Sequence, residues 1–224
     1  MKVAVCYRGH YIRDVVRDKK KKFKGTHHIN FFENLENHQK MLLNSFDNPE
    51  IFFHTYTFDE ETDIKLIKSL SPTKYIIDKN TSKYVNTSIK CVNELVDPEK
   101  FDFIINLRFD VVFKKKFTSE QLVPNKFNFL FKDVERFWKM QKRVSDLLYS
   151  FDSKFHFNFQ CGLSNRKSLF ANKIPHMLFT GMLECGCNSS DLGFLVEGFH
   201  SSWVSEIKST NELVTLNRGY GVEY

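Results

Sequence analysis

The sequence predicts an α/β fold in which helices flank a mixed, mostly parallel sheet, and three observations predict it. Short apolar segments rich in Val, Ile and Phe alternate with amphipathic segments over residues 1–117, which is the pattern of repeated strand–helix–strand units. Residues 103–107 (FIINL) form a nearly continuous apolar run of the kind found in a strand buried on both faces. Arg108 and Asp110 follow this run directly, and open α/β sheets bind ligands at the carboxyl ends of their strands.

The first strand is expected at residues 2–7, and Arg8-Gly9-His10 ends it. A strand, a glycine turn and then a basic residue, here Arg13, form a generic phosphate-contact layout. One glycine is equally typical of an ordinary strand–helix turn, so both interpretations stay open at this point. The charge run KKKKFK at residues 19–24 favours a solvated loop, and contact with an anionic acceptor, a membrane surface or nucleic acid is the alternative.

A helix is expected from Asn30, a possible N-cap, because apolar residues recur on one face up to Phe46. The elements expected next are strands at residues 50–58, 74–78 and 103–107, separated by helices that carry Ile64, Ile67 and Leu70, and Val85, Ile89, Val92 and Val96. His54 lies where its strand would leave the core, and a hydrogen-bonded structural role is the simpler interpretation than contact with a ligand.

The alternation weakens after residue 117. The elements expected there are strands at residues 127–131, 155–164 and 213–216, a long helix at residues 133–151, and helical segments at residues 166–182 and 190–207. No internal repeat, low-complexity segment or linker divides the chain, so we expect residues 1–224 to form a single domain.

Composition narrows the classes of protein. The 33 basic and 27 acidic residues give a net charge of +6, which favours anionic partners without the basic excess of a nucleic-acid-binding protein. The five cysteines are odd in number, and Cys185 and Cys187 form a C-x-C without a second pair, which indicates reduced thiols rather than a zinc site. No run is long enough for a transmembrane segment, and the start is too short for a signal peptide, so a cytoplasmic protein is predicted.

Three motifs in order carry a family resemblance: YRGHYIR at residues 7–13, IFFHTY at residues 51–56 and FIINLRFD at residues 103–110. They resemble small GT-A-type glycosyltransferases encoded by large DNA viruses, such as the chlorella viruses, and by bacterial surface-polysaccharide clusters. The resemblance continues more loosely through FNFQCGLSNRKSL and WVSEI. It implies a GT-A-like, Rossmann-like fold with a nucleotide-sugar-binding half at residues 1–117 and an acceptor-side half at residues 118–224, in the host cytoplasm if the protein is viral.

The resemblance implies transfer of a hexosyl or pentosyl group from a nucleotide-diphosphate donor to a glycan or glycoprotein acceptor, with a UDP-sugar favoured and a GDP-sugar possible. In the family a D-x-D motif binds Mn²⁺ or Mg²⁺ at the diphosphate. Asp110 matches the second aspartate and is the expected metal ligand, and His200 is a candidate to complete the metal shell. Arg108 stands at the first aspartate position, which leaves the need for a metal open, because a guanidinium can itself offset diphosphate charge.

Other roles implied by the resemblance are contacts with the donor and a catalytic base. The expected nucleotide or diphosphate contacts are Tyr7, Arg8, Gly9, Arg13, Asp78 and Arg108. An inverting enzyme needs a base near the acceptor hydroxyl, and the candidates are Asp152, His156 and Asp191, for each of which a structural or surface role is the simpler interpretation. Lys114–Lys116 could hold an anionic acceptor.

Two other classes of function were weighed. A sugar-nucleotide nucleotidyltransferase usually has a glycine-rich loop after its first strand, and here that turn contains a single glycine. A basic nucleic-acid-binding module would interleave aromatic and basic residues on an exposed sheet, whereas most Phe residues here occupy core-like positions. We therefore do not expect nucleic acid as a partner.

Overall fold

The computed structural model describes residues 1–16, 26–79, 85–114, 116–122, 124, 127–129, 148–156 and 214–216. Its centre is a six-stranded sheet with the order β5-β4-β1-β6-β9-β8. The strands are β1 (Val3–Arg8), β4 (Glu50–Tyr56), β5 (Lys74–Asp78), β6 (Phe103–Arg108), β8 (Phe127–Phe129) and β9 (Leu148–Asp152). The first four are parallel to one another, whereas β9 runs antiparallel to both β6 and β8. The sheet is therefore mixed and mostly parallel, as predicted.

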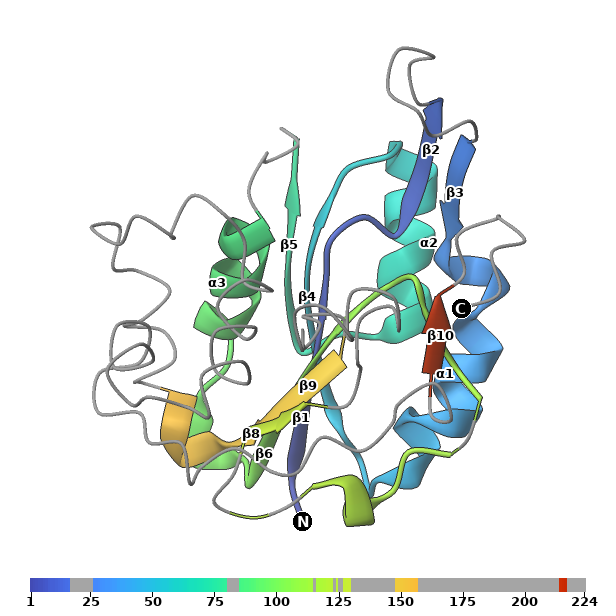
Figure 1. Cartoon of the computed structure of the whole chain (residues 1–224). Coiled ribbons are helices and arrows are strands. Elements are labelled where there is room, and N and C mark those ends of the chain that lie inside the picture. Colours follow the sequence, from blue (N-terminus) through green and yellow to red (C-terminus); the bar gives the residue numbers. More distant parts are fainter. Residues whose placement is uncertain are drawn as a thin grey trace, which may run out of the picture.

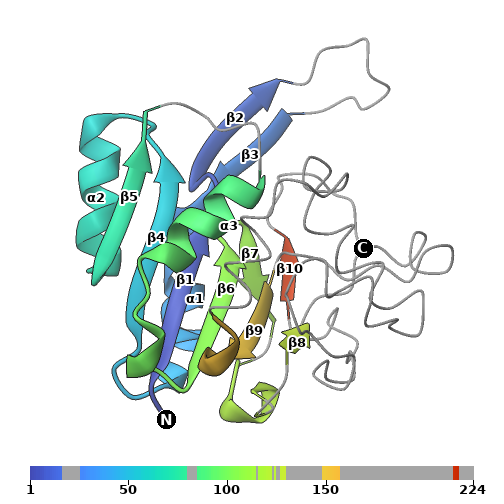
Figure 2. The same ribbon diagram turned by 90° about the vertical axis from the view of Figure 1, so that its left-hand side faces the viewer.

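Helices cover both faces of the sheet. The helices are α1 (Leu35–Met41), α2 (Glu60–Leu70) and α3 (Val85–Glu94), and the 3₁₀ turns are η1 (Phe31–Glu33), η2 (Leu43–Ser45), η3 (Pro98–Lys100), η4 (Ser119–Gln121) and η5 (Ser153–Phe155). The strands separate α1 and α2 on one side from α3 on the other (Figures 1 and 2). This three-layer arrangement is Rossmann-like.

Two antiparallel strand pairs lie beside the main sheet. The strands β2 (Ile12–Val16) and β3 (Thr26–Asn30) form one pair, and β7 (Val111–Phe113) and β10 (Val214–Leu216) form the other. The β2–β3 pair projects beyond the carboxyl ends of the parallel strands (Figures 1 and 2). The turn after β1 therefore leads into another strand and not into a helix.

Alternation along the strands decides which residues meet which helices. In β1, Val3, Val5 and Tyr7 join the core cluster that includes Leu66 and Leu70 of α2. Successive side chains of a strand point to opposite faces, so Arg8 lies on the α3 side. The same alternation puts His54 of β4 and Arg108 of β6 on that side, since their neighbours Phe53 and Leu107 belong to the core cluster.

Local signals explain where the helical segments begin. The Asn30 side chain accepts a hydrogen bond from the Phe32 amide at 3.2 Å and caps η1, and the Asp59 side chain accepts one from the Thr62 amide at 2.8 Å and caps α2. The Asn30 cap follows the sequence expectation, although the segment after it is divided into η1, α1 and η2 rather than forming one helix.

The second half corrects two expectations. Residues 148–151 belong to β9 and not to the end of a long helix, because Leu148, Tyr149, Ser150 and Phe151 are all buried where β9 pairs with β6. A short apolar run buried on both faces has no periodicity that separates strand from helix. Phe155 is the last residue of η5 and does not begin a strand. The rest of the expected 133–151 helix and 155–164 strand, and the 166–182 and 190–207 segments, lie outside the described residues.

Other expectations of the second half are confirmed by β8 within residues 127–131 and by β10 within residues 213–216. Within the described ranges, no helix combines the length and the apolar character needed to cross a lipid bilayer.

Candidate functional site

The strand order reverses between β1 and β6, and open α/β sheets form their ligand-binding crevice at such a reversal. The chain moves from β1 to β4 and β5 on one side and then returns to β6 on the other side of β1. In open α/β sheets this reversal is the topological switch point, and ligands bind there outside the carboxyl ends of the strands. Arg8 and Arg108 are register partners and are the last residues of the two strands. Two guanidinium groups therefore lie at the position where this fold class binds ligands.

A third polar side chain extends this row. His54 of β4 is the register partner of Arg8 on its other side. Neighbouring strands lie about 4.8 Å apart, so His54, Arg8 and Arg108 form a lateral row on the α3 side of the sheet. Both Arg8 and His54 are buried, at 2% and 0% exposure. We call these three residues the polar row.

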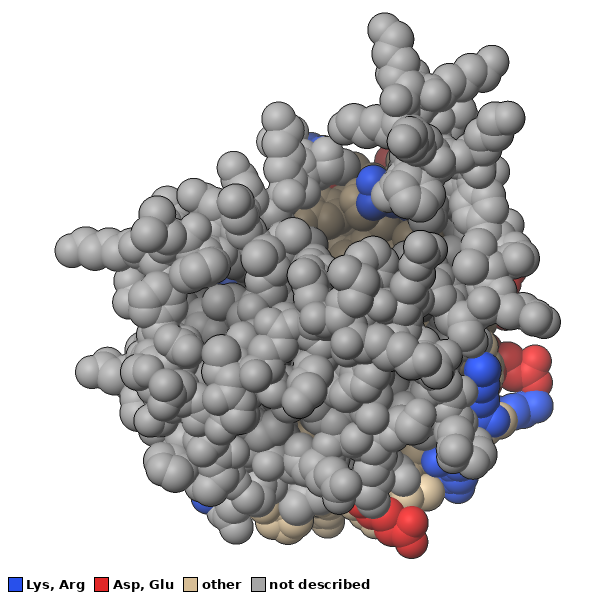
Figure 3. All heavy atoms as spheres, viewed as in Figure 1, with Lys and Arg blue, Asp and Glu red and all other residues tan. Residues whose placement is uncertain are grey.

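The Gly9 turn follows the polar row. Gly9 has a φ of 86°, a left-handed conformation that favours glycine, and a Cβ built there would meet no atom within 4 Å. Its amide donates to Ser88 Oγ at 3.2 Å, and Thr55 Oγ1 donates to its carbonyl at 2.8 Å. The turn is thus held by α3 and β4 while the space above its Cα stays open. Figure 3 shows a hollow near this end of the strands, with atoms of Lys or Arg residues, in blue, at its rim.

Arg108 and Asp110 form a bidentate pair. Arg108 Nε donates to Asp110 Oδ1 at 2.8 Å, and Arg108 Nη2 donates to Asp110 Oδ2. The Asp110 side chain is 1% exposed, whereas the Arg108 side chain is 27% exposed. A buried carboxylate that holds a guanidinium by two bonds fixes its orientation. Asp110 therefore fixes the orientation of a partly exposed cation at the carboxyl end of β6.

This geometry bears on the expected metal. Both Asp110 oxygens already accept from Arg108, and the described residues contain no group of three His, Cys, Asp or Glu side chains that could hold a metal ion. A divalent cation bound at Asp110 would also meet the positive charge of Arg108 at close range. In this structure Asp110 holds a guanidinium, and its role as a ligand of Mn²⁺ or Mg²⁺ stays a prediction. His200, the other expected ligand, lies outside them.

His10 reports the positive charge of the site. Burial and, after it, the nearby charges of Arg13 and Arg108 together lower its pKa from 6.5 to about 4. Its ring lies 4.6 Å from the ring of Tyr56, centre to centre. His10 is thus neutral near pH 7, and Arg13, on the exposed part of β2, adds its charge to the same neighbourhood.

A hydrogen-bonded relay joins the polar row to Asp78. His54 Nδ1 lies 2.8 Å from Ser88 Oγ, and His54 Nε2 lies 2.9 Å from Asp78 Oδ2. The Asp78 side chain, at the carboxyl end of β5, is 43% exposed. His54 therefore makes structural hydrogen bonds, as the simpler interpretation held, and one of them holds a predicted site residue. Ser88 was not predicted, because one serine in an amphipathic helix carries no signal of what its hydroxyl meets.

Comparisons with known proteins add little to this site. No protein-family model and no curated protein matches the chain. Among solved structures, HddC from Yersinia pseudotuberculosis matches 78% of this chain and 85% of its own chain, with 12% sequence identity and a TM-score of 0.41. A match at that TM-score supports no inference about function, so the functional assignment depends on the site itself.

The other predicted site residues lie elsewhere. The Tyr7 side chain is buried on the α1 side, where its hydroxyl lies 3.1 Å from His38 Nδ1, so the structure does not bring its side chain to the polar row. Asp152 pairs in register with Phe103, the first residue of β6, and therefore lies at the amino end of that strand. His156 is buried with its Nε2 2.8 Å from the Asn93 carbonyl, near the end of α3.

The structure thus does not bring Asp152 and His156, two of the three candidate bases, to the polar row. Asp152 accepts from the Lys154 amide at 3.2 Å and so caps η5. Asp152 and His156 both lie towards the amino ends of the parallel strands, whereas the polar row lies at their carboxyl ends. Asp191 lies outside the described residues. Lys114 and Lys116 are exposed just after β7.

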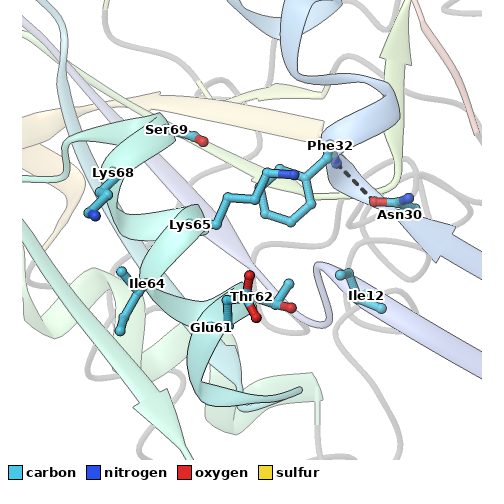
Figure 4. A pocket seen from close by; sticks show the side chains of 9 residues that line it. All are labelled: Ile12, Asn30, Phe32, Glu61, Thr62, Ile64, Lys65, Lys68 and Ser69. Carbon is cyan, nitrogen blue, oxygen red and sulfur yellow. Dashed lines mark hydrogen bonds between the residues drawn. The ribbon is translucent and has the colours of Figure 1, made fainter.

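The described residues also form a groove of about 670 Å³ between α2 and the base of the β2–β3 pair (Figure 4). Its lining residues are Ile12, Asn30, Phe32, Glu61, Thr62, Ile64, Lys65, Lys68 and Ser69. Lys65 Nζ lies 4.5 Å from the centre of the Phe32 ring, so a cation covers this aromatic face. None of the predicted site residues lines this groove.

Proposed function

We propose that the protein is a glycosyltransferase that binds a nucleotide-diphosphate sugar at the crevice between β1 and β6 and transfers the sugar to a glycan or glycoprotein acceptor. The observation that carries the proposal is the pairing of Arg8 and Arg108 across the switch point, beside the open Gly9 turn. The three sequence motifs that resemble small GT-A-type enzymes of large DNA viruses and bacterial polysaccharide clusters supply the substrate class.

The charge of the site suits a diphosphate. Guanidinium groups match phosphate oxygens with two parallel donors, and Arg8, Arg13 and Arg108 approach the same edge. The helix α3 also begins at this edge, since Ser88 in its first turns contacts Gly9. The positive end of a helix dipole favours an anion. These groups would bind the diphosphate and orient the attached sugar.

The reaction explains why fixed cations are useful. The bond between the anomeric carbon and the diphosphate oxygen breaks, and its electron pair leaves with the nucleoside diphosphate. The acceptor hydroxyl oxygen forms the new bond to the anomeric carbon and gives its proton to a base. Donors oriented in advance stabilise the charge that develops on the leaving oxygen. Arg108, held by Asp110, is oriented in this way. A divalent ion, where one is bound, would supply the same charge stabilisation.

Ligand screening tests this proposal. UDP-, GDP-, dTDP- and CMP-sugars should be compared by thermal shift with Mn²⁺ and with EDTA, and we expect a UDP-sugar to stabilise the protein most, in both conditions. A shift that requires Mn²⁺ would support the prediction that Asp110 and His200 are metal ligands. No shift with any nucleotide, together with salt-sensitive binding of DNA, would overturn the glycosyltransferase assignment in favour of a nucleic-acid-binding module.

Variants locate the binding site. Arg8→Gln and the neutral pair Arg108→Gln/Asp110→Asn should each weaken nucleoside diphosphate binding by roughly tenfold to a hundredfold, the effect of losing hydrogen bonds to a charged group. Lys40→Gln is the matched control, because it removes one positive charge from the exposed surface of α1, where the Lys40 side chain is 67% exposed. Equal weakening in Arg8→Gln and Lys40→Gln, which both remove one positive charge, would mean that general charge, and not the crevice, determines affinity.

A further inference from the structure

The relay through His54 has a defined direction. Nε2 faces the Asp78 carboxylate and donates to it, so in a neutral imidazole Nδ1 accepts from the Ser88 hydroxyl. Ser88 Oγ in turn accepts from the Gly9 amide. The bonds therefore run from Gly9 through Ser88 and His54 to Asp78, and each link donates to the next. Hydrogen bonds in such a chain polarise and strengthen one another.

The relay is buried in its middle and open at its ends. Ser88 and His54 are 2% and 0% exposed, whereas the Asp78 side chain is 43% exposed and the space above Gly9 is empty. The N–H of the buried imidazole needs an acceptor, and Asp78 supplies one that is half-exposed rather than buried. Here a buried histidine fixes the orientation of an exposed acceptor.

Asp78 keeps acceptor capacity for a ligand. Its Oδ2 accepts a hydrogen bond from His54 Nε2, and its backbone carbonyl accepts one from the Thr57 amide at 2.9 Å. Among the described residues, Asp78 Oδ1 has no hydrogen-bond partner, and an ionised carboxylate can only accept. A ligand group that meets Oδ1 must therefore carry a hydrogen-bond donor, such as a hydroxyl or an N–H.

The spacing fits two parts of one ligand. Asp78 ends β5, and β4 lies between β5 and β1, so two strand spacings, roughly 10 Å, separate it from the Arg8 strand. A nucleoside extends over a comparable length from its diphosphate. The Gly9 end of the relay lies beside the cations, and the Asp78 end lies where the nucleoside would reach.

We propose that His54 and Ser88 are positioning residues that hold Asp78 in register with the Gly9 turn, so that Asp78 accepts a hydrogen bond from the nucleoside while the arginines hold the diphosphate. This inference rests on the proposed function, because it takes the ligand at the arginines to be a nucleoside diphosphate. The donor on the nucleoside is a ribose hydroxyl or a base N–H, and the experiment separates these two sources.

Two substitutions at one position separate the two bonds of His54. The Gln amide can reach about as far as Nε2 and so keeps a donor for Asp78. The Asn amide oxygen lies near the position of Nδ1, and so it accepts from Ser88 without reaching Asp78. Dissociation constants of UDP and inorganic pyrophosphate should be measured by calorimetry for wild type, His54→Gln, His54→Asn and Asp78→Ala, with melting curves as a check on folding.

We expect His54→Asn and Asp78→Ala to weaken UDP binding about tenfold, the factor that corresponds to about 1.4 kcal/mol, and to leave the pyrophosphate constant within about twofold. His54→Gln should recover most of the UDP affinity. If the ribose supplies the donor, Asp78→Ala should not weaken binding of the 2′-deoxy or the 3′-deoxy form of UDP. If the base supplies it, both deoxy forms should lose affinity as UDP does.

Two results would overturn the inference while the proposed function stands. One is unchanged UDP affinity in His54→Asn and Asp78→Ala, and the other is an equal loss for UDP and pyrophosphate, which would indicate a general disturbance of the edge. Absence of UDP and pyrophosphate binding in the folded wild type has a different meaning, because it overturns the proposed function and removes the basis of the relay.

Discussion

Two buried histidines lie on opposite sides of the sheet, and their hydrogen bonds differ at one end. On the α1 side, His38 Nε2 lies 2.6 Å from the Val111 carbonyl, and Nδ1 lies 3.1 Å from the Tyr7 hydroxyl. On the α3 side, His54 bridges Ser88 and Asp78. The first network ends on a buried backbone carbonyl, whereas the second ends on a half-exposed carboxylate. The difference is that only the second network ends on a group that a ligand could reach, which is why the proposal above gives the positioning role to His54 and not to His38.

The closed network supports the site from behind. Because a carbonyl only accepts, His38 Nε2 carries the proton and Nδ1 accepts from Tyr7. The His38 ring lies within 5.5 Å, centre to centre, of the rings of Tyr7, Phe31 and Phe113. His38 thereby joins α1 to β1 and to the start of β7, directly after Asp110.

The largest expected effect breaks the closed network. His38→Ala should lower the free energy of unfolding by about 4 kcal/mol, because it leaves a cavity among three aromatic rings and an unpaired Tyr7 hydroxyl. Urea denaturation measures this loss. Where the variant still folds, the ratio of UDP to pyrophosphate affinity should equal that of wild type. A changed ratio of UDP to pyrophosphate affinity would show that the His38 network also affects how the nucleoside is bound.

The second effect concerns pH. Burial lowers the pKa of His38 from 6.5 to about 4 in the folded state. Between these values the unfolded chain binds a proton that the folded chain does not, so stability falls as the pH falls from 6.5 to 4, by about 3 kcal/mol from this residue. His10 and His156 act in the same direction, because burial lowers the pKa of each.

Denaturation curves at pH 7 and pH 4.5 test the sign. His38→Gln should lose less stability between these two values than wild type does. An equal loss in both proteins would mean that His38 is not held neutral in the folded state.

The third effect concerns the Arg108–Asp110 charge pair, at the carboxyl end of β6. Arg108→Met should lower the free energy of unfolding by about 2 kcal/mol, less than for a fully buried pair, because the Arg108 side chain is 27% exposed. Adding Asp110→Asn should recover most of this loss, since the carboxylate charge is then gone. Thermal denaturation of the single and double variants measures both steps. If the double variant is no more stable than Arg108→Met, the unpaired Asp110 carboxylate is not the cause of the lost stability.

The smallest effect comes from a control substitution at Asp59, a residue that belongs to neither the His38 network nor the His54 network. Asp59→Ala removes the cap of α2, where the Asp59 side chain accepts from the Thr62 amide, and should cost about 1 kcal/mol of unfolding free energy. Its UDP and pyrophosphate affinities should match wild type. If Asp59→Ala binds UDP more weakly and pyrophosphate as well as wild type does, lower stability alone produces the effect expected of His54→Asn.

The sequence predicted the parallel half of the fold well, because each strand there is a short apolar run and each helix carries an apolar face. It also predicted Arg8, Gly9, Asp78, Arg108 and Asp110 as site residues, and the structure gathers them at the carboxyl edge, because polar residues directly after buried strands of a parallel sheet meet there.

What the sequence did not reveal depends on partners distant in the chain. Ser88 is 34 residues from His54, and the motif at residues 103–110 does not show that the Arg108 side chain bonds to Asp110. The sequence also did not show that Asp152 pairs in register with the first residue of β6, or that His156 bonds to the Asn93 carbonyl near the end of α3.

The most direct test of the central claim is a crystal structure of the protein with the nucleoside diphosphate that stabilises it most. The predicted result is a diphosphate within hydrogen-bonding distance of the Arg8 and Arg108 guanidinium groups, above the Gly9 turn, with the nucleoside extending towards Asp78. A nucleotide bound elsewhere, such as in the groove lined by Phe32 and Lys65, with the Arg8–Arg108 crevice empty, would contradict it.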